Sequence, residues 1–191
     1  MRELRHEIEK ETGERTFINI PQAKVEKVRE LIPEWVPIIS VFPQTRNDAD
    51  EALDCFALGK DTAAVFHLMR VAEWGLRAFC IHLGFRRIKS KIKATGKVEF
   101  TPIDYTTWEG MLGQLRGKVN KKLARLRRGS AKQKLQETYL PMIEEIEAFK
   151  DAWRNHVMHN RKAYISGDVL AITSHVMRLM GALASKGICE T

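Results

Sequence analysis

The feature that most constrains the fold is an apolar segment from Asp61 to Leu83, DTAAVFHLMRVAEWGLRAFCIHL, which is bounded by Gly59 and Gly84. Its apolar side chains would cover nearly every direction around a helix, and a helix that is apolar all round is normally buried. Asp61 suits an N-terminal cap, and Gly84 suits the left-handed position that follows a helix. The segment therefore predicts a central helix against which the other elements pack.

Four polar side chains interrupt this segment at steps of three, three and four residues: His67, Arg70, Glu73 and Arg77. On a helix they form one stripe. In one interpretation the stripe is a solvated or inter-subunit edge, in which Glu73 pairs with Arg70 and Arg77. In the other, His67, Arg70 and Glu73 support a catalytic group or contact a phosphate. The sequence leaves both interpretations open.

Four further segments carry apolar residues every three or four positions, which is typical of amphipathic helices. Strand-like alternation and a glycine-rich phosphate loop are both missing from the sequence. We therefore expect an all-α fold, an up-and-down helical bundle. The predicted helices run from Asn47 or Asp48 to Leu58, from Glu109 to about Arg127, from Ser130 toward His159, and from Gly167 or Asp168 to about Lys186, where Asp168 is the expected cap.

The N-terminal part of the chain differs from the rest in its prolines. After a charged arm, a short helix is predicted to end at Pro33. The next residues, 33–43, contain three prolines among large apolar side chains, which favours an irregular strap with one helical turn at most. We expect one domain, in which residues 1–45 form the arm and strap packed on a bundle of residues 46–191.

Length and composition set further limits. A chain of 191 residues suits one domain. Because the sequence has no long apolar run and no apolar leader at its N-terminus, we expect a cytoplasmic protein without a membrane partner. The three cysteines are odd in number and widely spaced, so they predict neither a disulfide framework nor a zinc knuckle. We expect no cofactor.

The positive charge is concentrated between Arg86 and Lys134, where fifteen Lys or Arg residues accompany three acidic ones. Within this region, residues 86–107 have no sustained periodicity and are interpreted as a basic excursion between helices. Such a block attracts polyanions, although a solvated surface has the same composition. The side chains that we expect to contact RNA are Lys89, Lys91, Lys93, Arg116, Lys121, Lys122 and Arg125.

The stretch from Lys150 to Tyr164, KDAWRNHVMHNRKAY, combines an arginine, an amide and two histidines. Arginine binds phosphate and histidine exchanges protons near neutral pH, so the set suits phosphodiester chemistry. On a regular helix, however, Arg154 and His159 would point about 140° apart. Their cooperation requires a helix end, a distorted helix or a second subunit.

Two other interpretations of this stretch remain. His156 and His159 could share a metal ion, but a zinc site needs three or four ligands and no third ligand follows nearby, so we expect no metal there. Alternatively, Arg154 and His159 have only a structural role, as caps of a helix end.

The residues Arg154-Asn155-x3-His159 resemble the R-x4-6-H motif of the HEPN superfamily, including the polar residue after the arginine. The surrounding DAWRNHVMH is similar to bacterial stand-alone HEPN proteins. The segments EALDCFALG and TAAVFHLMRVAEWGLRA, between Phe42 and Gly84, resemble the front half of those proteins. The resemblance extends over most of residues 42–184 and excludes the basic residues 86–97.

This resemblance implies a HEPN-type bundle that forms a homodimer and acts as a metal-independent endoribonuclease of toxin or defence type. Arg154 and His159 would be catalytic, with Asn155 orienting them and His156 as possible support. The resemblance also implies an antitoxin or a nucleotidyltransferase as possible partner. The alternative is a non-catalytic helical module that binds RNA or protein.

Overall fold

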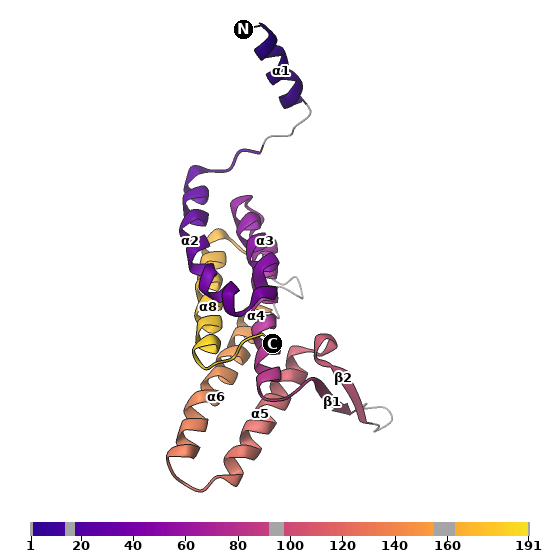
Figure 1. Cartoon of the computed structure of the whole chain (residues 1–191), viewed down its shortest axis with the longest axis vertical. Coiled ribbons are helices and arrows are strands. Elements are labelled where there is room, and N and C mark those ends of the chain that lie inside the picture. The colour runs from indigo at the N-terminus through magenta and orange to yellow at the C-terminus, as the bar shows by residue number, and fades with distance from the viewer. Residues whose placement is uncertain (1, 14–17, 92–97, 155–162, 191) are drawn as a thin grey trace.

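The computed structural model describes residues 2–13, 18–91, 98–154 and 163–190. The described chain is mostly helical, with one two-stranded sheet, as expected for an all-α protein (Figure 1). Helix α1 (Arg2–Gly13) stands apart from the bundle in Figure 1. None of the helices in the described ranges is both long and apolar enough to cross a membrane.

The predicted central helix is confirmed as α4 (Asp61–His82). It packs against α3 (Arg46–Ala57), α5 (Trp108–Arg125) and α8 (Ser166–Ser185). Most of its apolar side chains are buried, because neighbours cover it on several sides, whereas Phe66 is exposed. Gly84 follows the helix with a φ of 82°, which is the left-handed conformation expected of a terminating glycine.

The helices α4 and α8 approach closely at Gly75. A Cβ atom at this position would lie 2.6 Å from Sδ of Met180 and 2.8 Å from Cδ1 of Leu183. Both of these α8 side chains are fully buried. Only a residue without a side chain fits here without displacing its neighbours.

The predicted proline-rich strap is wrong. Helix α2 (Gln22–Val41) continues through Pro33 and Pro37. The two prolines are four residues apart, so they share one face, and that face is exposed. Carbonyl groups that lose a partner to proline can bind water there. On the opposite face, Trp35 and Ile38 are buried in the core, and this apolar spacing outweighs the cost of the prolines.

The basic excursion contains strands that the sequence did not predict. Strand β1 (Arg87–Lys91) pairs antiparallel with β2 (Val98–Pro102), which corrects the expectation of irregular structure. Ile88 of β1 is 2% exposed and packs into the core, whereas β2 is mostly exposed. With one buried apolar side chain on β1, the strands have too little alternation to be recognised from sequence.

Helix α5 and helix α6 (Ser130–Phe149) form the long antiparallel pair at the lower end of Figure 1. Thr107 caps α5, since its Oγ1 accepts a hydrogen bond from the backbone N of Gly110 at 3.2 Å. Pro141 lies on an exposed part of α6. After Phe149 the chain continues as a π-helical turn, η3 (Lys150–Arg154).

The start of α8 differs in detail from the prediction. Ile165 is the N-cap residue, and Asp168 lies three positions inside the helix. Its Oδ2 accepts a hydrogen bond from the backbone N of Ile165 at 3.2 Å. Asp168 therefore satisfies the helix start from within, as the acid at the third position of a capping box does.

Candidate functional site

The predicted catalytic stretch begins where α6 loses its regular geometry. The backbone of Arg154 ends the π-helical turn η3, and Asn155, His156 and His159 lie outside the described residues. The regular α-helical geometry of α6 ends at Phe149, before Arg154, and the angle between Arg154 and His159 stays a prediction. The catalytic assignments stay predictions.

The first and last residues of this stretch, Lys150 and Tyr164, are bound to the bundle. Nζ of Lys150 donates a hydrogen bond to Oε2 of Glu109 on α5 at 2.9 Å, and this bond raises the pKa of Lys150. On the far side, the backbone N of Tyr164 donates to Oγ1 of Thr62 at 3.4 Å. Both flanks are thus held against the helices that form the core, one at the start of α5 and one at the start of α4.

The polar stripe of α4 shares an acceptor, Asp48, which the sequence pattern places only at the start of a predicted helix. Oδ1 of Asp48 on α3 accepts from Nε of Arg70 at 2.6 Å and lies 3.1 Å from Nδ1 of His67. Asp48 is 7% exposed. The suggested pairing of Arg70 with Glu73 is therefore replaced by a pairing with Asp48, because α3 packs along this face of α4.

The other end of the stripe links α4 to α5. Oε1 of Glu73 accepts from Nη2 of Arg77 at 2.7 Å, which confirms the suggested Glu73–Arg77 pair. Its Oε2 accepts from Nε1 of Trp108 at 3.1 Å. Arg77 also donates to the backbone O of Asp104 and lies over the ring of Trp74. The stripe is thus bonded within the chain on both neighbouring helices.

A cavity of about 440 Å³ adjoins Arg77. Glu190, near the C-terminus, lines it and accepts a hydrogen bond from the backbone N of Gln44 at 2.9 Å. Burial raises the pKa of the Glu190 carboxyl. No sequence pattern indicates this cavity, because its walls come from segments far apart in the chain: Pro43, Gln44, Trp74, Arg77, Ala78, Ile81, Asp104 and Glu190.

The basic side chains of α5 fall into two groups, and the second continues into the turn after α5 and the start of α6. Those beside other helices are bonded internally: Arg116 pairs with Glu147 on α6, and Nζ of Lys118 donates to the backbone O of Leu83. Those at the far end are exposed. We call this second group the basic tip, and it comprises Lys121, Lys122, Arg125, Arg127, Arg128 and Lys134.

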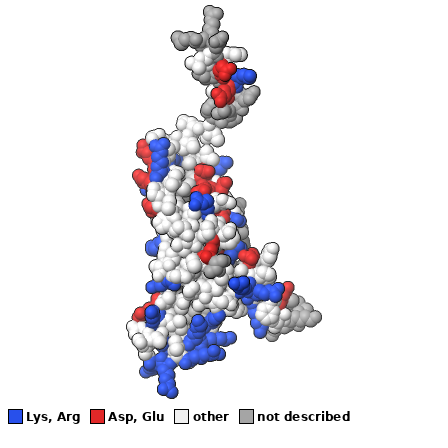
Figure 2. Space-filling view, in the orientation of Figure 1, with Lys and Arg blue, Asp and Glu red and all other residues white. Residues whose placement is uncertain are grey.

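Figure 2 shows the basic tip as a continuous group of Lys and Arg side chains at the end of the molecule where α5 meets α6. No acidic residue occurs between Gly110 and Gln136. No ion pair to a tip side chain is seen within residues 2–13, 18–91, 98–154 and 163–190. The tip is therefore a surface of uncompensated positive charge, which attracts polyanions.

The remaining predicted RNA contacts lie on the β-hairpin. Lys89 is exposed on β1, and its backbone O accepts a hydrogen bond from Nε2 of Gln114 at 3.1 Å, which holds the strand to α5. Lys91 ends β1, and Lys93 lies outside the described residues. A role for these three lysines in RNA binding stays a prediction.

Comparison with known proteins adds no relative. No protein-family model matches the chain, and no curated protein and no solved structure matches it either. The HEPN resemblance therefore rests on the sequence motifs alone.

Proposed function

We propose that this protein binds RNA through the basic tip and cleaves it as a metal-independent endoribonuclease of HEPN type, with a role in toxin or defence systems. The observation that carries the proposal is the basic tip, an exposed surface with no acidic residue in the surrounding sequence. A surface of this kind binds the phosphates of a nucleic acid without reading its sequence. The cleavage chemistry is inferred from the resemblance of Arg154 to His159 to the R-x4-6-H motif.

In the proposed reaction the 2′-hydroxyl of RNA attacks the adjacent phosphorus. His159 takes part in moving the proton of the 2′-hydroxyl to the 5′-oxygen, whose bond to phosphorus breaks. The products carry a 2′,3′-cyclic phosphate and a 5′-hydroxyl. Arg154 stabilises the charge that develops on the phosphate, and Asn155 orients the pair. Because the nucleophile belongs to RNA, DNA is not cleaved.

A homodimer is part of the proposal, since two copies of the motif in one cleft would supply groups to both sides of a phosphate. The α4 stripe then has a supporting role. His67 and Arg70 hold α4 to α3 through Asp48, and Glu73 holds it to Trp108 of α5. These bonds fix the helices that carry the flanks of the catalytic stretch.

The test is cleavage of varied RNAs in EDTA by wild type, Arg154→Ala and His159→Ala, at concentrations where the dimer persists. Arg29→Ala and His82→Ala serve as controls, since both residues are exposed and lie outside the motif. We expect both motif variants to lose cleavage while they keep their helical content and bind RNA. If wild type cuts none of the RNAs, the enzyme assignment is wrong, and a non-catalytic binding module, such as a partner of a nucleotidyltransferase, replaces it.

A further inference from the structure

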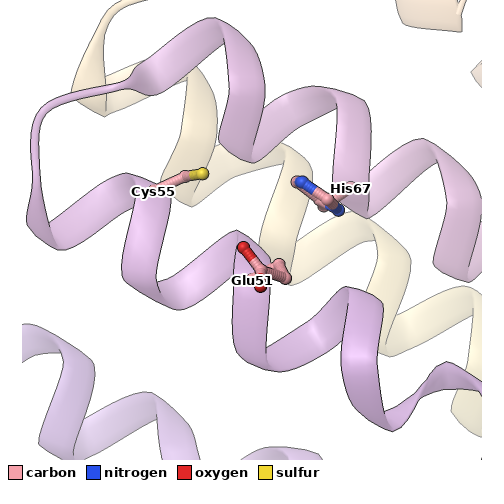
Figure 3. Close-up of side chains that lie close together, drawn as sticks. All are labelled: Glu51, Cys55 and His67. Atoms are coloured by element: carbon pink, nitrogen blue, oxygen red, sulfur yellow. The ribbon is translucent and has the colours of Figure 1, made fainter.

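Three side chains of types that commonly bind metal ions lie close together between α3 and α4. Glu51 and Cys55 are four residues apart and share one face of α3, and His67 projects toward them from α4 (Figure 3). A carboxylate oxygen, the Sγ and an imidazole nitrogen all lie within 4.8 Å of one another. The sequence did not predict this group, because its members lie on different helices with unrelated spacing.

Asp48 orients the imidazole of His67. Its Oδ1 lies 3.1 Å from Nδ1 of His67, and this contact favours the tautomer with the proton on Nδ1, in which Nε2 of the neutral ring has the lone pair that a metal ion binds. Asp48 is in turn fixed by Nε of Arg70 at 2.6 Å. In metal-binding histidines, the ring nitrogen that does not bind the metal usually donates to a carboxylate, which fixes the ring and its tautomer.

We propose that Glu51, Cys55 and His67 bind one divalent transition metal ion of the zinc type, with Asp48 as a positioning residue. Three atoms that all lie within 4.8 Å of one another have a common point about 2.8 Å or less from each. Zinc bonds to these ligand types are about 2.0 to 2.3 Å long, so side-chain shifts of about 0.5 to 0.8 Å close the site.

The ligand set selects the class of ion. A thiolate with an imidazole favours zinc and its neighbours over magnesium or calcium, which prefer oxygen ligands. Glu51 is exposed, so solvent reaches the site and a water molecule completes a tetrahedral set. On binding, the ion replaces the thiol proton of Cys55, which passes to solvent. The ion links α3 to α4 and stabilises their packing.

This inference goes beyond the proposed ribonuclease. The site contains neither a residue of the R-x4-H motif nor a residue of the basic tip, although it shares His67 and Asp48 with the α3–α4 contact. Metal binding is measured by titration and RNA cleavage is measured in EDTA, so the two proposals are tested separately.

The test is a competition titration of metal-free, full-length protein with Zn²⁺ and with Co²⁺, in a reducing buffer with a chelating dye. We expect one ion per chain, a thiolate-to-cobalt charge-transfer band and a raised melting temperature. Asp48→Asn lowers the affinity about 10- to 100-fold and keeps the band, as loss of a positioning residue should. Glu51→Gln and His67→Gln lower the affinity more, and Cys55→Ser removes the band.

Three variants serve as matched controls. Cys189→Ser removes an exposed thiol elsewhere, Asp50→Asn an exposed carboxylate about 100° around α3 from Glu51, and His82→Gln an imidazole at the end of α4. All three should bind like wild type. The proposal is overturned if no ion binds at one per chain, or if Glu51→Gln and Cys55→Ser bind as tightly as the controls. Glu51 is exposed, so Glu51→Gln folds and gives a result even where Cys55→Ser does not.

Discussion

The close approach of α4 and α8 at Gly75 makes a prediction whose magnitude follows from the structure. In Gly75→Ala, the new methyl group would lie 2.6 Å from Sδ of Met180 and 2.8 Å from Cδ1 of Leu183. Neither neighbour is exposed, so neither can move out into solvent. The methyl group must therefore displace packed atoms in the core.

Two free energies of opposite sign decide the outcome. Replacing glycine by alanine inside a helix stabilises it by about 0.8 to 1.0 kcal/mol. Overpacking a close-packed core costs about 1 to 3 kcal/mol. We expect Gly75→Ala to lower the free energy of unfolding by about 1 kcal/mol. In Gly181→Ala, on α8, nothing lies within 4 Å of the added Cβ, so the free energy of unfolding of this control should rise by about 0.8 to 1.0 kcal/mol, the full difference between glycine and alanine in a helix.

The assay is urea unfolding followed by circular dichroism for the two single variants and for a double-mutant cycle with Met180→Ala. Shortening Met180 removes the nearest contact, so Gly75→Ala should be better tolerated in that background, with a coupling of about 0.5 to 3 kcal/mol. If Gly75→Ala stabilises the protein as much as Gly181→Ala does, the helices do not approach as described.

Three further predictions concern the core, pH and RNA binding. Trp108→Phe loses the hydrogen bond to Glu73 and should lower the free energy of unfolding by about 1 to 3 kcal/mol, and an unchanged urea midpoint would contradict this bond. Burial lowers the pKa of His175 from 6.5, so the unfolded chain binds more protons and stability falls as the pH drops below 6.5. The fall should be smaller in His175→Gln, and equal pH profiles would refute the assignment. The double variant Lys122→Ala with Arg125→Ala should bind RNA more weakly. The slope of log affinity against log salt concentration should be shallower by about 0.7 for each phosphate that is no longer neutralised. An unaltered slope would exclude the tip as the binding surface.

The sequence predicts the parts of this fold that depend on local chemistry. The apolar segment of α4 and its terminal glycine specify a buried helix and its end, whatever surrounds them. The helix through Pro33 was missed, because the exposure of a proline face depends on which side of α2 meets the core. The helix continues through Pro33 because Trp35 and Ile38 are buried against the rest of the bundle, and this burial depends on tertiary packing.

In the candidate sites, too, features set by local sequence were predicted and features set by packing between helices were not. A basic helix face can be seen in the sequence, but the bond between Arg116 and Glu147 depends on the packing of α6 against α5. The sequence places Asp48 at the start of a helix, and only the packing of α3 beside α4 brings it to His67 and Arg70. Residues brought together across two helices carry no fixed spacing that a sequence motif could capture.

The most direct test of the proposed function uses an RNA that wild-type protein cleaves, prepared with and without one 2′-deoxy substitution at the cleaved position, in EDTA. We predict that the all-RNA strand yields a 2′,3′-cyclic phosphate and a 5′-hydroxyl, and that the substituted strand is not cut there. Equal cleavage of both strands, or cleavage that requires an added metal ion, would contradict the proposed mechanism.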